Sequence, residues 1–313
     1  NRPECALAHR SGLTLVPDWT GKGGVAAISP SGATRRIEAD RPLRPNGISL
    51  EPGGAILLAH LGDDDGGLWR LHPDGRTEPV LTEIGGTPVP PSNFPLRDAE
   101  GRIWLTISTT VRPRSDDYRS SAETGFVVLI DEAGPRTIAE GLGYANECAL
   151  SADGRTLFVN ETFARRTAAF DVAADGSLSR RRTVASYGEG VYPDGLALDV
   201  DGGLWITSIV SNRVIRVAPD GSQTIVLDDV DAATVEAAEA AWREDRLGPE
   251  HLKPAPAATL KALSNLAFAG DDRRDALLGC LHGDRIARFR APVAGLAPSW
   301  WDADLGPLAR YLN

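Results

Sequence analysis

Short apolar runs recur along the whole chain, and glycine and proline residues separate them. Runs of this length, rich in β-branched and aromatic residues and bounded by turn formers, predict many short strands. One phrase, a hydrophobic residue followed two positions later by Pro-Asp-Gly or a degenerate form of it, predicts a hairpin turn wherever it appears. It appears at residues 28–32, 71–75, 130–134, 172–176 and 217–221.

A second pattern precedes these turns: a polar residue, here called a leader, is followed eight positions later by glycine. Leaders stand at positions 4, 46, 93, 146 and 194, and a sixth at 265 lacks the glycine, so the spacings are 42, 47, 53, 48 and 71 residues. Such spacings fit the roughly 40–50 residues of a four-stranded propeller blade. The sequence therefore predicts an all-β fold, a six-bladed β-propeller with four-stranded antiparallel blades, formed by residues 1–313 as a single domain.

Two insertions interrupt this period. Residues 109–124 are polar and follow the second predicted strand of the third blade. Residues 231–262 account for the longest spacing, and within them residues 232–246 predict a short helix. We expect the apolar stripe of this helix to dock on the propeller rather than to bind a partner. The stripe consists of Val235, Ala238 and Trp242.

Charge and hydropathy exclude two classes of partner. The 313 residues are 42% hydrophobic, and 33 basic against 43 acidic residues give a net charge of −10. No Lys/Arg-rich block is present, which argues against nucleic acid, and no apolar run approaches the roughly 18–20 residues that span a bilayer. We therefore expect a cytoplasmic monomer or weak homo-oligomer that binds a small molecule. Secretion stays open, because the chain begins at Asn1 without Met or an apolar leader peptide and is compatible with a trimmed N-terminus.

The three cysteines indicate neither a disulfide framework nor a zinc-thiolate cluster. Cys5, Cys148 and Cys280 are far apart and form no CxxC motif. We expect them to be buried small hydrophobic residues.

The leaders carry the candidate chemistry, because the innermost strand of every propeller blade lines the central channel. Equivalent positions form a ring of oxygen-bearing side chains: Glu4, Asn46, Asn93, Asn146, Asp194 and Asn265. These oxygens suit Ca²⁺, Mg²⁺, Mn²⁺ or another divalent cation, and no thiolate or imidazole favours a Cys/His zinc site. The alternative is turn chemistry, since Asn-Gly and Asp-Gly are common turn formers. It does not explain why the polar residue always precedes the innermost strand.

A second ring follows from chain direction, because the second strand of each blade returns to the face from which the first departed. Residues 14 to 17 positions after each leader are again polar: Asp18, His60, Ser108, Glu161, Ser208 and His282. His60 and His282 are candidate proton carriers or substrate contacts, and each is also compatible with a purely structural hydrogen bond. Glu161 fits either the surroundings of the metal or a loop brace.

At these residues the chain resembles a known family, the senescence marker protein/gluconolactonase/regucalcin-like propellers, with paraoxonases as more distant relatives. The resemblance covers essentially the whole chain. The motifs that carry it are Arg2-Pro3-Glu4-Cys5, Arg44-Pro45-Asn46-Gly47, Ser92-Asn93-Phe94, Ala145-Asn146-Glu147 and Tyr192-Pro193-Asp194-Gly195-Leu196-Ala197.

The resemblance implies one divalent cation, whose identity among Ca, Zn, Mn, Mg and Fe stays open. It implies Glu4, Asn146 and Asp194 as metal ligands and Asn93 as the auxiliary residue that contacts substrate or completes the shell. It also implies hydrolysis of a lactone or related ester. In this reaction a metal-activated water, assisted by Asp194, attacks the carbonyl that the metal polarises. Asp194 and Asn93 are then the catalytic candidates. The substrate-binding candidates are Asn93, Asn46, His60, Arg112, Glu161 and His282.

One departure from the family concerns the substrate. Its sugar-lactone members have an Arg two residues before the position of Asn93, and this chain has Pro91. Arg112, Arg114 or Arg119 of the polar insertion could replace it, as part of a lid. A smaller or more apolar lactone or ester is therefore as open as a polyol sugar lactone.

Two other functions remain open at this stage, because a propeller fold hosts many activities. One is a non-catalytic binding or interaction module with a structural divalent cation. The other is a synthase-type relative in which a Glu or His acts without metal.

Overall fold

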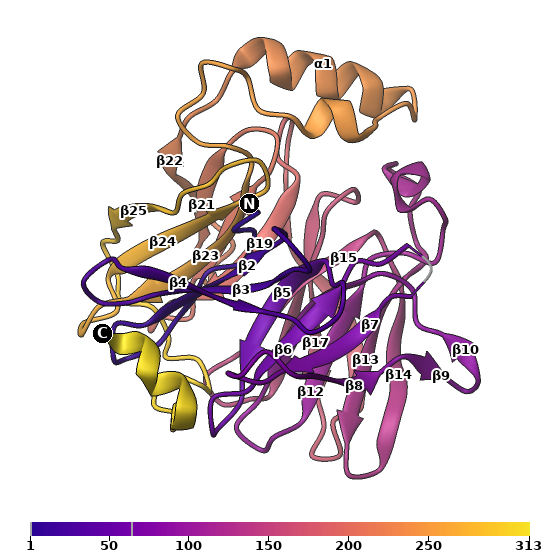
Figure 1. Cartoon of the computed structure of the whole chain (residues 1–313). Coiled ribbons are helices and arrows are strands. Elements are labelled where there is room, and N and C mark those ends of the chain that lie inside the picture. Colours follow the sequence, from indigo (N-terminus) through magenta and orange to yellow (C-terminus); the bar gives the residue numbers. More distant parts are fainter. Residues whose placement is uncertain (1, 64) are drawn as a thin grey trace.

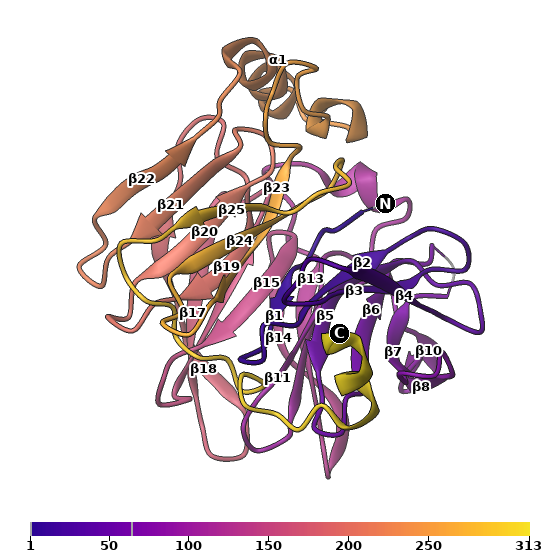
Figure 2. The ribbon, with the colours of Figure 1, turned by 60° about the vertical axis from the view of Figure 1, so that its left-hand side comes forward.

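The structure is a computed structural model that describes residues 2–63 and 65–313. Over these residues it is a six-bladed β-propeller, and successive antiparallel sheets follow one another around a central axis (Figures 1 and 2). The predicted fold class is confirmed. None of the helices in the described ranges is long and apolar enough to cross a membrane.

The strands are consecutive in sequence within each blade, from the innermost to the outermost. Blades one and two consist of β1 (Leu7–Ala8), β2 (Thr14–Asp18), β3 (Gly24–Ile28), β4 (Thr34–Glu38), β5 (Pro45–Leu50), β6 (Ile56–His60), β7 (Gly67–Leu71) and β8 (Thr77–Leu81). Blades three and four consist of β11 (Ser92–Arg97), β12 (Ile103–Ile107), β13 (Gly125–Asp131), β14 (Gly134–Leu142), β15 (Ala145–Leu150), β16 (Thr156–Glu161), β17 (Arg166–Val172) and β18 (Leu178–Ser186). Blades five and six consist of β19 (Pro193–Leu198), β20 (Leu204–Ser208), β21 (Arg213–Val217), β22 (Gln223–Asp228), β23 (Leu263–Ala269), β24 (Asp275–Cys280) and β25 (Ala287–Arg290). A small ribbon, β9 (Glu83–Ile84) with β10 (Thr87–Pro88), extends from blade two.

Both sequence patterns mark the blades, as predicted. The five turn phrases connect the third and fourth strands of blades one to five, as residues 28–32 do between β3 and β4. Glu4 stands before the innermost strand of blade one, as predicted, whereas the other leaders lie at the second or third position of an innermost strand. Two leaders are followed by glycine because the inner strands approach each other closely. A Cβ at Gly47 would lie 2.8 Å from the carbonyl oxygen of Asn93, and a Cβ at Gly195 would lie 2.5 Å from Cα of Asn265.

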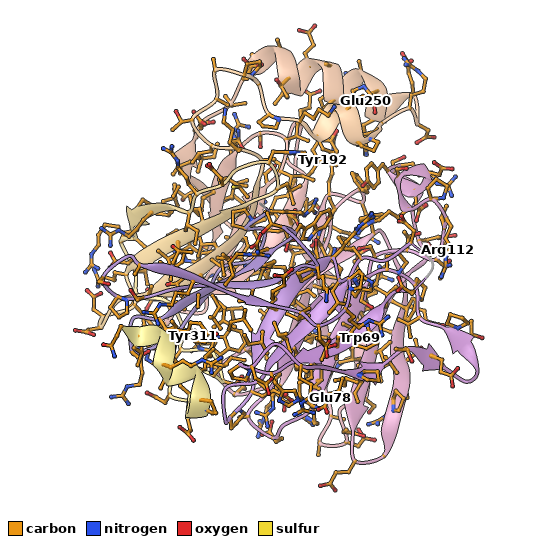
Figure 3. The ribbon with its side chains drawn as sticks, in the orientation of Figure 1. Trp69, Glu78, Arg112, Tyr192, Glu250 and Tyr311 are labelled. Atoms are coloured by element: carbon orange, nitrogen blue, oxygen red, sulfur yellow. The ribbon has the colours of Figure 1, made fainter. Side chains whose placement is uncertain are left out.

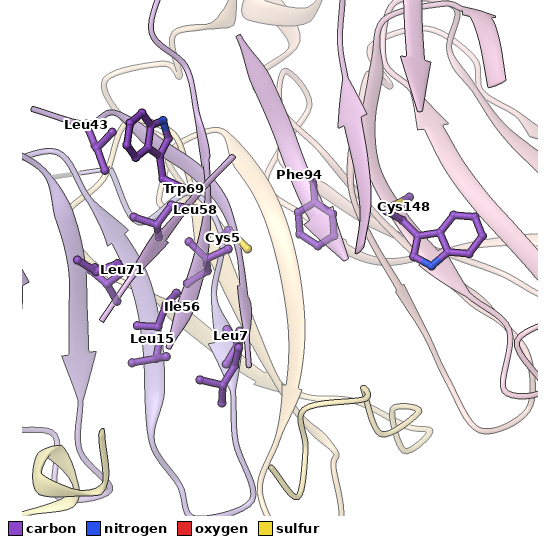
Figure 4. Close-up of a cluster of buried hydrophobic side chains, with 14 of the residues drawn as sticks. Cys5, Leu7, Leu15, Leu43, Ile56, Leu58, Trp69, Leu71, Phe94 and Cys148 are labelled. Atoms are coloured by element: carbon purple, nitrogen blue, oxygen red, sulfur yellow. The ribbon is translucent and has the colours of Figure 1, made fainter. Parts of the chain in front are cut away.

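The hydrophobic core lies between the blades. Figure 4 shows part of it, where Leu7, Leu15 and Ile56 lie together and Trp69 lies beside Leu43 and Leu58. Fully burying a large apolar side chain of this kind contributes about 1.5–3 kcal/mol to stability. The three cysteines are buried and free, as predicted.

Blades three and five repeat one internal hydrogen bond, in which a tryptophan eleven residues after the leader donates to an aspartate five residues after it. The indole Nε1 of Trp104 donates to Asp98 at 2.9 Å, and that of Trp205 donates to Asp199 at 2.9 Å. Both tryptophans are fully buried. The buried N–H group therefore keeps a hydrogen-bond partner in each blade.

The ends of the chain join blade six to blade one and cover one face. In the described residues blade six has three strands. The amide of Cys280 donates to the carbonyl of Pro3 at 2.9 Å, and the hydroxyl of Ser264 donates to the carbonyl of Glu4 at 2.7 Å. The C-terminal tail crosses the propeller and ends in the 3₁₀ helix η3 (Gly306–Leu312), whose Leu308 packs in the main core.

Both insertions lie at the end of the axis where the leaders stand. The second contains α1 (Ala232–Arg243) and the 3₁₀ helix η2 (Pro249–Leu252), and the first contains the 3₁₀ helix η1 (Arg114–Asp117) (Figure 1). The predicted helix is confirmed, with Asp231 as N-cap to the amide of Thr234 at 2.8 Å. It ends three residues earlier than predicted, because Asp245 takes a left-handed backbone conformation (φ 49°). Its apolar stripe packs on the propeller, with Ala238 fully buried.

Candidate functional site

A cavity of about 190 Å³ opens at this end of the axis, between the inner strands and the two insertions. Its polar lining comes from the N-terminal segment, the leaders, the first insertion and the loops that hold Arg44, Asp63 and Thr162. Its apolar lining comes from loops of the blades, including blades one and two, from the first insertion and from η2. The residues that line it are Arg2, Glu4, Trp19, Arg44, Asn46, Leu61, Asp63, Asn93, Arg114, Tyr118, Tyr144, Asn146, Thr162, Phe163, Asp194, Ile209, Leu252 and Leu281.

The structure brings five of the six leaders together in this cavity, and the sixth turns away. The carbonyl oxygen of the Asn265 side chain accepts from the amide of Ala6 at 2.8 Å. Its Nδ2 donates to Glu147 Oε1 at 2.8 Å. Asn265 thus joins neighbouring inner strands and does not line the cavity.

Four leaders present a buried oxygen that has no hydrogen-bond partner in the described part of the chain. These atoms are Glu4 Oε2, Asn93 Oδ1, Asn146 Oδ1 and Asp194 Oδ1. Buried polar atoms are rarely left unpaired in folded proteins. Four of them on the wall of one small cavity therefore indicate a place for a ligand.

The amide groups of this set are held by neighbouring hydroxyls. Asn93 Nδ2 donates to Ser108 Oγ at 3.0 Å, and Asn146 Nδ2 donates to Thr162 Oγ1 at 3.0 Å. Each bond occupies the nitrogen and leaves the carbonyl oxygen for the cavity.

Asn46 differs from these four leaders because its polar atoms are already paired. Its Nδ2 donates to Glu4 Oε1 at 2.9 Å and to the carbonyl of Asn93 at 3.2 Å, while its Oδ1 accepts from Arg2 at 3.3 Å. The geometry therefore makes Asn46 a brace for the carboxylate of Glu4.

Two carboxyl groups, those of Glu4 and Asp194, are buried together in the wall of this cavity. Burial raises the pKa of Glu4 to about 7, against the opposing effect of Arg2. Burial also raises the pKa of Asp194 well above its usual range, and the charge of Glu4 raises it further. Both shifts mean that two negative charges here are costly without a compensating cation.

The donor set fits a hard divalent cation. It offers two carboxylates and two amide oxygens, with no thiolate or imidazole. Because half of the set is asparagine, no group of three or more His, Cys, Asp and Glu residues that could hold a metal occurs within the described ranges. Oxygen donors of this kind suit ions such as Ca²⁺, Mg²⁺ or Mn²⁺.

Three arginines line the cavity, Arg2, Arg44 and Arg114, and each lies near an aromatic ring. The guanidinium of Arg2 lies 4.6 Å from the ring centroid of Trp19, and that of Arg114 lies 5.4 Å from the ring centroid of Tyr144. Arg114 Nε donates to the hydroxyl of Tyr144 at 2.7 Å, and Arg114 Nη2 lies 3.4 Å from Ser108 Oγ. The Nε of Arg2 is buried without a hydrogen-bond partner in the described residues.

Of the arginines predicted in the first insertion, the cavity receives Arg114. Arg112 is exposed at the outer edge of this loop (Figure 3) and does not line the cavity. Arg119 donates to Asp117 at 3.1 Å. The sequence predicted that this loop could contribute an arginine but not which one, because an irregular segment has no helical or strand periodicity from which side-chain direction follows.

The second predicted ring lies mostly outside the cavity. His60 is buried, with Nδ1 accepting from the amide of Arg44 at 2.9 Å and Nε2 lying 3.2 Å from Asp65 Oδ1. Glu161 accepts from the amide of Gly143 at 2.6 Å and pairs with Arg166 and Arg181, which makes it a loop brace. His282 does not line the cavity either.

The other three members of this ring make structural or bridging hydrogen bonds. Asp18 accepts from Thr20 and pairs with Arg36, and Ser208 accepts from the amide of Tyr192 at 3.0 Å. Ser108 approaches the site, because it contacts both Asn93 and Arg114.

Several lining residues were not expected from the sequence. Tyr118, Tyr144 and Phe163 form an aromatic cluster, with ring centroids 4.5–5.4 Å apart. Arg2 lies two residues before Glu4 in the same motif, and only Glu4 of this motif was predicted as a site residue. The spacing of Arg2 from Glu4 was the available signal, since alternate residues of an extended segment share a face.

A second cavity, of about 360 Å³, lies further along the inner strands and is bounded by residues 296–300 of the C-terminal tail. Its inner wall holds Glu147, whose Oε2 accepts from the amide of Leu196 at 2.8 Å and whose Oε1 accepts from Asn265 at 2.8 Å. Burial raises the pKa of Glu147 well above its usual range. The unpartnered oxygens all belong to the first cavity, which is therefore the candidate active site.

Comparison with known families gives one match that covers more than half of the chain. The model of the family described as "SMP-30/Gluconolactonase/LRE-like region" matches residues 64–235. This segment contains Asn93, Asn146 and Asp194, whereas Glu4 lies before it.

Several curated proteins and many solved structures are similar to this chain. A protein named lactonase drp35 from Staphylococcus saprophyticus is 25% identical over 189 residues, which are 57% of this chain and 54% of that protein. A regucalcin from Danio rerio is 38% identical over 151 residues, 46% of this chain and 48% of that protein. The chain thus spans about half the length of the curated relatives it matches.

Among solved structures, a calcium-binding protein named regucalcin from Agrobacterium tumefaciens has a TM-score of 0.67. The match covers 96% of this chain and 95% of the other at 15% identity. At this identity the likeness supports the shared fold alone.

Proposed function

The chain belongs to the SMP-30/Gluconolactonase/LRE-like family, and on that premise we propose that it is a divalent-cation-dependent hydrolase that opens a lactone or cleaves a related ester. The observation that carries the proposal is the set of four buried, unpartnered oxygens on one cavity wall: Glu4 Oε2, Asn93 Oδ1, Asn146 Oδ1 and Asp194 Oδ1. The similarity to a protein named lactonase supports the choice of reaction.

In this proposal Glu4, Asn146 and Asp194 hold the cation, and Asn93 completes its shell or contacts the substrate. When bound, the cation supplies Lewis acidity that polarises the scissile carbonyl and lowers the pKa of a nearby water. The vacancies that four protein oxygens leave on an ion that prefers six or more suit catalysis better than a purely structural site.

The carboxylate of Asp194 accepts a proton from the attacking water. It is suited to this because it lies on the cavity wall with the other residues proposed to hold the cation, beside the place of the activated water. The water oxygen bonds to the acyl carbon, the bond from that carbon to the ring oxygen breaks, and the departing oxygen takes up the proton. The product is a hydroxy acid.

The two insertions, together with loops of blades three and four, keep this chemistry away from bulk water. Leu252 of η2 and the aromatic cluster of Tyr118, Tyr144 and Phe163 form an apolar roof. A low-dielectric site strengthens the electrostatic interactions that stabilise developing charge.

The test measures hydrolysis of a panel of lactones and aryl esters in a pH-stat. Chelated protein is compared with protein restored with Ca²⁺, Mg²⁺, Mn²⁺, Zn²⁺ or Fe²⁺. We expect turnover only after restoration. Asp194→Asn should lower turnover by at least about a hundredfold, which is the scale of general acid–base catalysis. Asp201→Asn is the matched control, since Asp201 is an exposed aspartate on a turn of the same blade.

Turnover that survives chelation, or that Asp194→Asn leaves unchanged, would overturn the mechanism. Tight cation binding without hydrolysis of any panel member would instead favour a non-catalytic binding module.

A further inference from the structure

The cavity contains two guanidinium groups that are not in ion pairs. Neither Arg2 nor Arg114 contacts a carboxylate in the described part of the chain, and both bond to neutral side chains instead. Arg44, at the rim, has Asp63 at 3.7 Å. Surface arginines of this protein, by contrast, commonly pair with Asp or Glu, as Arg10 does with Asp302.

The charge balance of the site changes when a divalent cation is present. When both are ionised, Glu4 and Asp194 contribute −2, Arg2 and Arg114 contribute +2, and Arg44 and Asp63 at the rim balance each other, so the charged lining groups sum to zero. A divalent cation bound to the two carboxylates brings the sum to +2. A positive excess in a small, partly dry cavity favours an anionic ligand.

Both guanidiniums are held in place and retain donor capacity. Trp19 and Tyr144 support them as aromatic neighbours, and Arg2 Nε is buried without a partner in the described residues. A guanidinium carries five N–H donors in a fixed fork that matches a carboxylate. An anionic group would supply the acceptor that Arg2 Nε lacks.

The remaining walls do not suit a polyol. Apart from the charged groups and the asparagines, the lining is mainly aromatic and aliphatic. Its neutral hydroxyls belong to Thr162, which bonds to Asn146 and Pro193, to Tyr144, which accepts from Arg114, and to Tyr118. A ligand with many hydroxyls would lose hydrogen bonds to water against such walls. The volume of about 190 Å³ also restricts the ligand to a small molecule.

We propose that the substrate of this site is a small lactone or ester that bears a carboxylate, which Arg2 and Arg114 bind while the scissile carbonyl faces the four leader oxygens. This inference rests on the proposed hydrolase function and specifies its substrate class.

The test uses a matched pair of substrates, the five-membered lactone 5-oxotetrahydrofuran-2-carboxylate and its neutral carboxamide. The two differ in charge and hardly in shape. For the cation-restored protein we expect kcat/KM to favour the carboxylate by about tenfold to a hundredfold, the range of a charge-assisted hydrogen bond. Arg114→Gln and Arg2→Gln should each reduce this preference about tenfold, mainly through KM, and Arg114→Lys should retain part of it. Arg285→Gln is the control, since the side chain of this arginine is 89% exposed and does not line the cavity.

A second measurement separates this inference from the hydrolase proposal. Tetrahydrofuran-2-carboxylate cannot be hydrolysed, and calorimetry compares its binding with that of its carboxamide in wild type and in Arg114→Gln. Preferential binding of the anion that Arg114→Gln removes supports the anion site, even if no lactone is hydrolysed and the hydrolase proposal fails. Hydrolysis of both lactones with equal kcat/KM, unaffected by either Gln variant, would overturn the inference and leave the hydrolase function standing. Equal binding of the two non-hydrolysable ligands would also overturn it. Thermal melts establish that each variant is folded.

Discussion

At the scale of single residues, the site depends on hydroxyls that fix which atom of each asparagine faces the cavity. An asparagine amide can present either its oxygen or its nitrogen, and the wrong orientation would offer a donor where a cation needs an acceptor. Thr162 Oγ1 accepts from Asn146 Nδ2 and donates to the carbonyl of Pro193 at 2.7 Å. Thr162 therefore links the orientation of Asn146 to the backbone just before Asp194.

Replacing this hydroxyl should weaken cation binding without unfolding the protein. We expect Thr162→Val, which keeps the side-chain shape, to reduce cation affinity about tenfold, as is usual when a hydrogen-bond partner of a metal ligand is lost. Thr162→Ser retains the hydroxyl and should restore most of the affinity. Calorimetric titration of the chelated variants with Ca²⁺ or Mn²⁺ measures both. Equal affinities in the Val variant and wild type would show that Asn146 does not need this anchor.

His60 gives a pH prediction at the same scale. Burial lowers the pKa of folded His60 below its ordinary value of 6.5, although Asp65 opposes the shift. Between the folded pKa and about 6.5 the unfolded chain binds more protons than the folded one, so stability falls as pH falls through this window. Melting temperatures between pH 8 and pH 5 should decline less steeply for His60→Gln than for wild type. Parallel declines would mean that His60 does not contribute to acid sensitivity.

At the scale of elements, α1 is attached to the propeller by a buried ion pair as well as by its apolar stripe. Glu239 pairs with Arg165, and its Oε1 accepts from the amide of Gly190 at 2.7 Å. The guanidinium of Arg165 also lies 3.7 Å from the ring centroid of Trp242 and 4.3 Å from that of Tyr192, which Figure 3 shows beneath the helix. This arrangement holds the second insertion over the cavity.

Removing one partner of this pair should release the insertion. Glu239→Ala leaves the Arg165 charge buried and unpaired, which costs about 3–5 kcal/mol for a buried pair. We expect faster amide exchange and proteolysis within residues 231–262 and a higher KM, while the blades stay protected. Glu236→Ala is the matched control, because Glu236 lies on the exposed side of the same helix. Unchanged protection of the insertion in Glu239→Ala would show that the apolar stripe suffices to hold it.

At the scale of the whole molecule, the sequence predicts what repeats. The turns and leaders reveal the blade period because every blade reverses the chain at equivalent points and packs its inner strand closely against its neighbours at the axis. The repeat does not distinguish leaders by their contacts. Asn265 occupies an equivalent position, yet it is drawn away by Glu147 and by the amide of Ala6, two partners that the other leaders lack.

The features that do not repeat were harder to predict. The second ring assumed that residues on the returning strand reach the axis, but His60 and Glu161 are engaged by local partners in Arg44, Asp65 and Gly143. The aromatic cluster of Tyr118, Tyr144 and Phe163 comes from loops that do not repeat from blade to blade, so no sequence period predicts it. The fold could be predicted because it follows from repeated hydrophobic and turn patterns. The site could be predicted only in part because it depends on contacts of individual side chains.

The closed arrangement of blades also predicts how the molecule responds to loss of a cation. Two carboxyl groups are buried together, Glu4 just before the inner strand of blade one and Asp194 on the inner strand of blade five, and burial penalises both charges. A ligand that binds the folded state at a free concentration of 100 times its Kd stabilises it by about 2.7 kcal/mol. We therefore expect chelation to lower the melting temperature by several degrees and re-addition of the proper ion to restore it.

Glu4→Gln removes one charge, so it should raise the melting temperature of the chelated protein and reduce the increase in melting temperature that the cation produces. Glu100→Gln, on an exposed turn, is the matched control. A melting temperature that no divalent ion changes in wild type would refute a cation at the axis, whatever substrate the cavity accepts.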